Sequence, residues 1–102
     1  IITSSFKLPI ILEKIKPKLI NLGINLYENL SFSQLQKITS KSNLLISCHG
    51  AISHVAAAYN VKQIDIIDKT YDYNVWTDHF RNYKFLYRAN FKLLSKKIIN
   101  LI

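Results

Sequence analysis

The sequence predicts an α/β fold, on three observations. Short apolar runs alternate with segments of helical spacing along the whole chain, a pattern typical of a parallel sheet covered by helices. About half of the 102 residues are apolar and only four are Gly or Pro, which is a folding composition. The length fits one domain. We therefore expect a single domain over residues 1–102, a Rossmann-like three-layer sandwich with a parallel sheet of about five strands.

The first quarter of the chain is expected to contribute two short strands and a helix between them. Residues 1–3 are predicted to form the end of a strand. Pro9 suits the first turn of a helix, and apolar residues then recur at helical spacing until Gly23, which suits the position just past a helix end. Pro17 lies inside this helix and is expected to kink it. A second strand is predicted at 24–28.

The clearest local signal is a capping box. Ser31 and Gln34 have the Ser-x-x-Gln spacing in which each side chain bonds the other residue's backbone N–H. A helix is therefore predicted at 32–41. Its expected buried side chains are Phe32, Leu35 and Ile38.

The next predicted strand, 43–47, contains a continuous apolar run, as is typical of a strand covered on both faces. We expect it to be internal in the sheet. A helix is predicted at 51–59, with small side chains that allow it to pack close to the sheet, followed by a strand at 63–67.

The last third of the chain begins with an aromatic stretch, 68–82, that has no clear period. A final strand is predicted at 83–87. Asn90 suits the cap of a final helix that ends near Leu101.

The candidate site follows strand 43–47, because ligands of open α/β sheets bind beyond the carboxyl ends of the strands. The helix that begins at Ala51 presents unpaired N–H groups and the positive end of its dipole. Gly50 permits close approach of the backbone or a positive φ. His49 and His54 can donate to phosphate oxygens. We therefore expect a phosphate site at these four residues, although His54 can equally be a structural residue bonded to a backbone carbonyl.

The following strand and loop add further candidates. Asp68 follows strand 63–67 and can reach the same crevice, as acid, base or acceptor from a sugar hydroxyl, or it can be a solvated loop residue. Tyr71, Tyr73 and Trp76 can stack on a base or sugar ring, or they can pack the loop against the sheet.

Residues 49–58 resemble the donor loop of the ADP-heptose:lipopolysaccharide heptosyltransferases, glycosyltransferase family nine. In that family a strand ends in an Asp-Ser/Thr-Gly loop, and a His and an Ala-rich helix follow. His54 and the alanines at 56–58 match this pattern. His49 stands where the family has Asp, and Ala51 where it has Gly. Polysaccharide pyruvyl transferases carry a similar strand, His-containing turn and Ala-rich helix.

The resemblance implies the C-terminal, donor-binding half of a GT-B enzyme of surface polysaccharide or lipopolysaccharide assembly. Its ligand would be a nucleotide-diphosphate sugar, bound at His49, Gly50, Ala51, His54 and Asp68, and no cofactor is expected. The absence of methionine and the start at Ile1 suggest a fragment. The N-terminal domain would hold the glycan or lipid-linked acceptor and supply the base, so the isolated chain should be inactive. The expected location is cytoplasmic, or peripheral at the inner membrane face.

Other functions remain open from the residues alone. The net charge of +8 suits a small basic module that binds nucleic acid or a protein, but the lysines lack the clustering with aromatics that nucleic-acid surfaces show, and an A/T-rich codon bias explains them equally well. Cys48 can be a nucleophile paired with a histidine, or a zinc ligand together with His49, His54 and His79, although this spacing fits no standard zinc pattern. A fragment should also expose an apolar face and associate, for example as a homodimer.

Overall fold

The computed structural model describes residues 1–4 and 6–102. The chain forms two compact units, Ile1–Ile38 and Thr39–Ile102. Each unit is described by itself below.

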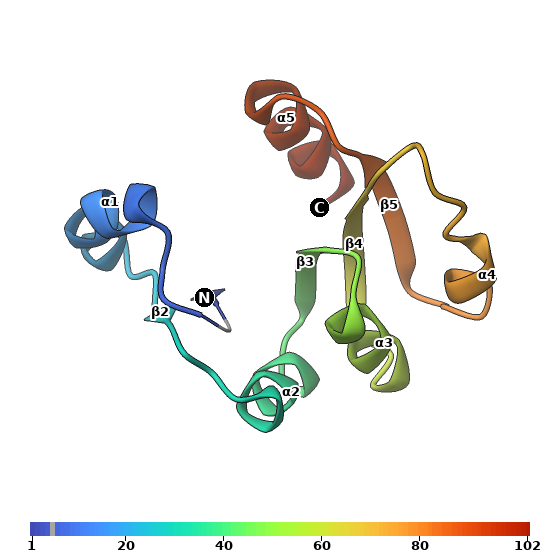
Figure 1. Ribbon diagram of the computed structural model, residues 1–102, viewed down its shortest axis with the longest axis horizontal. Coiled ribbons are helices and arrows are strands. Elements are labelled where there is room, and N and C mark those ends of the chain that lie inside the picture. The colour runs from blue at the N-terminus through green and yellow to red at the C-terminus, as the bar shows by residue number, and fades with distance from the viewer. Residues whose placement is uncertain (5) are drawn as a thin grey trace. The chain divides into compact units, whose positions relative to one another are not determined.

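The first unit is a small β-α-β arrangement (Figure 1). Strands β1 (Ile2–Thr3) and β2 (Leu26–Tyr27) pair in parallel, with Ile2 opposite Leu26. Helix α1 (Ile10–Asn21) joins them and is followed by Gly23, whose φ of 75° is the left-handed conformation predicted for the residue past the helix end. The two strands and the helix predicted for this part of the chain are therefore confirmed.

Helix α2 (Phe32–Ser40) spans the boundary between the two units, and its predicted capping box is confirmed. The backbone N–H of Ser31 donates to Gln34 Oε1 at 2.8 Å, and the backbone N–H of Gln34 donates to Ser31 Oγ at 3.2 Å. The expected burial of Phe32 is wrong, because this first-turn side chain is 55% exposed. The buried residue of α2 is Thr39, at 2% exposure.

The second unit contains a three-stranded parallel sheet in the order β3-β4-β5 (Figure 1). Its strands are β3 (Leu44–Cys48), β4 (Lys62–Ile67) and β5 (Tyr83–Tyr87). Its helices are α3 (Ala51–Ala58), α4 (Asn74–Thr77) and α5 (Phe91–Leu101). Helix α3 packs against β3 and β4, whereas α5 packs against β5.

The prediction of one sheet of about five strands is wrong in its pairing. Among the described residues, the five strands form a two-stranded and a three-stranded parallel sheet. The strand predicted to be internal, 43–47, is also at an edge, because β3 pairs only with β4 in this part of the chain. The internal strand is β4, where Gln63 and Asp65 are 1% and 0% exposed. Both polar side chains are therefore buried, although they alternate with isoleucines as in a half-exposed strand.

The core of the second unit combines apolar and polar side chains. Its buried apolar residues are Ala56, Val61, Ile64 and Ile67. Its buried polar residues are Thr39, Ser53, Gln63, Asp65 and Thr77. Burying a polar group costs free energy unless it forms a hydrogen bond. The hydrogen-bond partners of these buried side chains are therefore of interest for function.

Many large apolar side chains are exposed among the described residues, while the expectation of one continuous apolar face stays a prediction. On α5, Phe91 is 86% exposed and Ile99 is 69% exposed. Self-association through such a surface stays a prediction. None of the helices formed by residues 1–4 and 6–102 has the length and apolar character needed to cross a membrane.

Candidate functional site

A pocket of about 580 Å³ opens beside the carboxyl end of β3 and the start of α3. Its lining residues come from two segments, 49–54 and 71–76, all within the second unit. They are His49, Gly50, Ala51, His54, Tyr71, Asp72, Tyr73 and Trp76. The pocket therefore lies where a parallel sheet is expected to bind its ligand.

The first wall is the turn from β3 into α3. The backbone N–H of Gly50 donates to Ser53 Oγ at 3.3 Å, which helps to start the helix. Gly50 has a φ of 176°, so its backbone is extended and the positive φ considered from the sequence is not used. A Cβ at this position would meet only the carbonyl oxygen of Cys48, at 4.0 Å. The fold itself therefore leaves room for a side chain at position 50.

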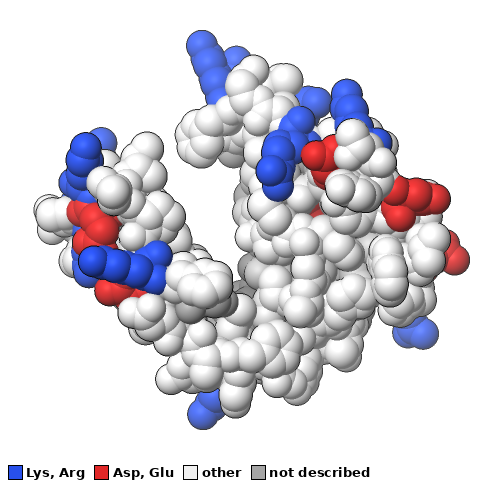
Figure 2. Space-filling view, in the orientation of Figure 1, with Lys and Arg blue, Asp and Glu red and all other residues white. Residues whose placement is uncertain are grey.

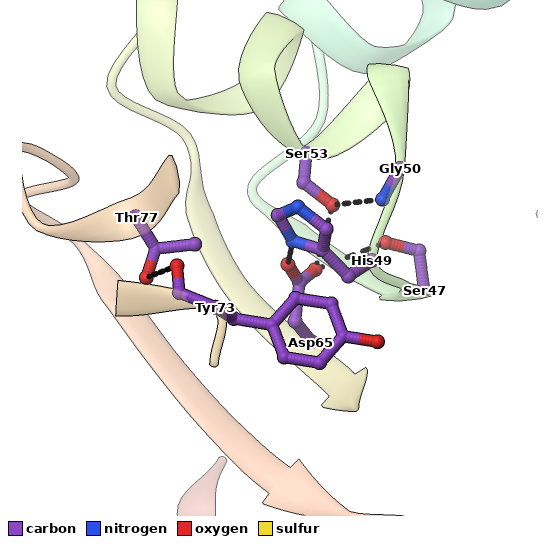
Figure 3. A network of polar contacts seen from close by, with 7 residues as sticks. All are labelled: Ser47, His49, Gly50, Ser53, Asp65, Tyr73 and Thr77. Carbon is purple, nitrogen blue, oxygen red and sulfur yellow. Dashed lines mark hydrogen bonds and ion pairs between the residues drawn. The ribbon is translucent and has the colours of Figure 1, made fainter. Parts of the chain in front are cut away.

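His49 is held by a buried carboxylate (Figure 3). Its Nδ1 lies 2.8 Å from Oδ2 of Asp65, which is fully buried on the central strand β4. The other oxygen, Oδ1, accepts hydrogen bonds from Ser53 Oγ at 2.9 Å and from Ser47 Oγ at 3.3 Å. Three elements of the second unit, β3, β4 and α3, and the turn between β3 and α3 thus converge on a single carboxylate.

This arrangement determines which atoms of His49 are available to a ligand. A carboxylate bonded to Nδ1 favours the proton on that nitrogen and fixes the orientation of the ring. The remaining nitrogen, Nε2, lies on the side of the ring away from Asp65 (Figure 3). His49 also lines the pocket, so Nε2 is the atom that can serve a ligand there, as acceptor when the ring is neutral and as donor when it is protonated.

Aromatic rings form most of the second wall. The ring of Tyr73 meets that of His49 edge to face, with centroids 4.9 Å apart. The ring of His54 lies 5.6 Å from His49 and 5.1 Å from Phe80. Farther out, Tyr71 and Trp76 are 70% and 59% exposed. Exposed aromatic faces beside a pocket are suited to stacking against a planar or sugar ring.

Asp72 is the acidic residue of the pocket lining. Its Oδ1 accepts a hydrogen bond from the backbone N–H of Asn74 at 2.9 Å, at the start of α4. Thr77, at the other end of α4, donates from Oγ1 to the carbonyl oxygen of Tyr73 at 3.0 Å. These bonds give the segment 71–76 a defined shape although it lacked any periodic pattern in the sequence.

Tyr83, the first residue of β5, is influenced by the buried carboxylate of Asp65. Its hydroxyl is buried and, among the described residues, has no hydrogen bond of standard geometry. Burial, together with the negative charge of Asp65, raises the pKa of Tyr83 to about 12. The phenol is therefore kept neutral next to the buried carboxylate.

The structure brings four of the five predicted site residues to the pocket: His49, Gly50, Ala51 and His54. Asp68 is not among the lining residues. It is half-buried, and its Oδ1 accepts from the backbone N–H and the Oγ1 of Thr70 at 2.9 and 2.8 Å. These two hydrogen bonds lower the pKa of Asp68. Asp68 therefore closes a turn of its own.

Sequence reasoning missed the roles of Asp65 and Asp72. One signal for Asp65 was available, because a charged residue in the middle of an apolar strand needs a partner, and a His-bearing turn follows the preceding strand. Asp72 had the weaker signal of an Asp two residues before a helix.

Cys48 is exposed and lies one residue before His49. Its Sγ accepts a hydrogen bond from a guanidinium nitrogen of Arg88 at 3.7 Å. Within residues 1–4 and 6–102, no group of three or more His, Cys, Asp or Glu side chains could hold a metal ion. The residues considered for zinc therefore do not gather into one site.

No protein-family model, curated protein or solved structure matches this chain.

Proposed function

We propose that this chain binds a nucleotide-diphosphate sugar and serves as the donor-binding domain of a glycosyltransferase in surface polysaccharide or lipopolysaccharide assembly. The proposal rests mainly on the position of His49. This residue directly precedes Gly50 and α3, lines a pocket with aromatic walls, and is held in place by the buried Asp65 of β4. The resemblance of residues 49–58 to family nine supports the choice of donor class.

The diphosphate would lie against the start of α3. The first N–H groups of a helix have no partner inside the helix, and together with the helix dipole they favour an anion. His49 and His54 line the same part of the pocket. His54 can donate a hydrogen bond to a phosphate oxygen from a ring N–H, and His49 can donate one from Nε2 when its ring is protonated. Because Asp65 already holds Nδ1 of His49, the ring needs no reorientation when the anion arrives.

The ring of the nucleotide or sugar would stack on the exposed aromatic side chains. Tyr71 and Trp76 present most of their surface to solvent beside the pocket. Burying such faces under a ligand ring is favourable and tolerates several ring types. The proposal therefore names a class of donor and not one nucleotide.

Under the proposed function, this chain would contribute to catalysis by electrostatic stabilisation. When the bond from the sugar to the diphosphate breaks, negative charge develops on the leaving group, and preformed donors at α3 would stabilise it. Glycosyl transfer also needs an acceptor hydroxyl and a base. We assign neither to this chain, and we propose that a second domain supplies them.

The competing function is a small basic module that binds nucleic acid or a protein. On the face seen in Figure 2, Lys and Arg side chains are scattered in small groups and form no continuous patch. Binding to nucleic acid through phosphates would show a steep dependence on salt concentration. A nucleotide bound in a defined pocket would depend less on salt, so a salt series separates the two functions.

Calorimetric titration of ADP, UDP and GDP into the wild-type chain and matched variants tests the proposal. His54→Ala should weaken binding by about 1.5–3 kcal/mol, the contribution of one charge-assisted hydrogen bond. Gly50→Val should abolish binding, because a branched side chain would occupy the space of the phosphate, yet it should leave the fold intact since a Cβ there meets nothing closer than 4.0 Å.

His79→Ala is the control, because His79 is exposed and does not line the pocket. It should bind as the wild type does. Equal binding by all four proteins would place the site elsewhere, and no binding of any nucleotide at millimolar concentration would remove the main support for the proposal.

A further inference from the structure

The pocket has two chemically different ends. One end is formed by His49, Gly50, Ala51 and His54 at the start of α3, and it can offer hydrogen-bond donors. The other end is formed by the segment 71–76, where Asp72 contributes a carboxylate and the aromatic residues contribute ring faces. A ligand that fits both ends would therefore have an anionic group at one end, and at the other end a ring with groups that donate hydrogen bonds.

Asp72 is available to a ligand. One of its oxygens accepts from the backbone N–H of Asn74, and within residues 1–4 and 6–102 no basic side chain makes an ion pair with it. Its side chain is exposed and belongs to the pocket lining. The second oxygen is thus free to accept hydrogen bonds from a ligand placed in the pocket.

The charge of Asp72 excludes a phosphate as its partner. Two anionic groups in contact repel, whereas a carboxylate accepts readily from paired hydroxyl groups, as acidic residues do with ribose in dinucleotide sites. A neighbouring stacking surface would hold such a polyhydroxylated ring in place. Tyr71 precedes Asp72 directly, and Trp76 lies four residues beyond it in the sequence.

We propose that Asp72 recognises two neighbouring hydroxyl groups on a sugar ring of the ligand, with the ring beside Tyr71 or Trp76 and the phosphates at the α3 end. This inference rests on the proposed function and adds a specificity-determining residue and an orientation to it. The ring can be the ribose of the nucleotide or the sugar it carries, since both present neighbouring hydroxyls.

The test compares four kinds of probe on the wild-type chain and on Asp72→Asn. The probes are inorganic pyrophosphate, the diphosphates ADP, UDP and GDP, the same nucleotides with both ribose hydroxyls removed, and nucleotide sugars of the same three nucleotides. Asparagine keeps an oxygen that can accept from the N–H of Asn74, so the start of α4 should persist. Asp78→Asn removes the same charge from an exposed residue outside the pocket lining and is the matched control.

If the ribose is the ring recognised, Asp72→Asn should weaken binding of the nucleoside diphosphates by about tenfold, the loss of charge-assisted hydrogen bonds. It should leave the dideoxy nucleotides and pyrophosphate unchanged. If the attached sugar is the ring recognised, the loss should appear with the corresponding nucleotide sugars and not with the diphosphates alone. Asp78→Asn should have no effect on any probe.

Three outcomes would overturn the inference while the proposed function stands. Unchanged binding of every probe, nucleotide sugars included, would show that Asp72 contacts none of them. An equal loss for all probes would indicate a structural role. Tighter binding of pyrophosphate would place the phosphates beside Asp72. By contrast, a wild-type chain that binds neither pyrophosphate nor any nucleotide would refute the proposed function, and this inference with it.

Discussion

The two units of the chain differ in how much interior each one has. In the first unit, helix α1 buries none of its residues, and Leu8, at 4% exposure, is the one buried apolar side chain that the described part of this unit contains. The second unit buries four apolar side chains, with Ile64 and Ala56 fully enclosed, and a set of polar ones around Asp65. The candidate site lies wholly in the unit that has a core of its own. A pocket with rigid walls needs a packed interior behind them, and the second unit has more of this interior than the first.

The largest expected loss of stability follows a substitution in the core of the second unit, at Ile64. Its side chain is fully enclosed on the central strand β4. Ile64→Ala should therefore lower the free energy of unfolding by about 2–5 kcal/mol, through lost burial and the cavity left behind. Urea unfolding followed by circular dichroism measures the change.

Ile11 is the matched residue in the first unit, because it is the same residue type at 71% exposure on α1. Ile11→Ala should change the free energy of unfolding by less than about 0.5 kcal/mol. Similar losses at both positions would mean that α1 is covered in solution and that the contrast between the units is smaller than described.

A second, smaller effect compares two asparagines with the same backbone strain. Asn29 in the first unit and Asn60 in the second both have a φ of 54°. Alanine is disfavoured in this left-handed region, so each Asn→Ala change should cost about 1 kcal/mol. Asn60 also accepts a hydrogen bond on Oδ1 from Asn82 Nδ2 at 2.9 Å, so Asn60→Ala should cost roughly 0.5–1 kcal/mol more.

Hydrogen exchange on both variants sharpens the comparison further. Asn29→Ala should raise exchange in the first unit alone if that unit opens independently. Loss of protection across both units would show instead that they unfold as one.

The smallest expected effect on stability near neutral pH is at Tyr83, in the polar interior of the second unit. Burial raises the pKa of Tyr83 to about 12 from 10.0. Below pH 10 the phenol is neutral in both folded and unfolded chains, and its contribution to stability is complete. As the pH rises from 10 toward 12, the unfolded chain ionises first, so stability falls.

Tyr83→Phe should remove that part of the alkaline loss. Near neutral pH it should change the free energy of unfolding little, because the buried hydroxyl makes no hydrogen bond of standard geometry among residues 1–4 and 6–102. Urea unfolding at several pH values on either side of 10 tests both points. An unchanged alkaline slope would show that Tyr83 ionises normally in the folded chain.

Elements set by local chemistry could be predicted from the sequence. The capping box of Ser31 and Gln34 predicted the start of α2, and Asn90 does accept from the backbone N–H of Leu93 at 2.9 Å at the start of α5. Gly23 has the left-handed conformation expected past α1. Each of these signals involves residues a few positions apart, so no knowledge of tertiary structure was needed.

The pairing of strands and the partners of Asp65 could not be predicted in the same way. Strand order depends on contacts between distant segments, and an apolar run such as 44–46 does not tell whether its strand has one neighbour or two. Asp65 alternates with isoleucines as an exposed residue of an amphipathic strand would. It is buried because Ser47, His49 and Ser53, which lie 12 to 18 positions away, supply its hydrogen bonds.

Cys48 gives this molecule a built-in reporter position. It is the single cysteine of the sequence, it is exposed, and it is adjacent to His49. A thiol-reactive fluorophore would therefore attach at one defined place, one residue before His49 of the candidate site, without any engineered residue. Ligands, salt and substitutions could then be screened by a change in emission from a single labelled preparation.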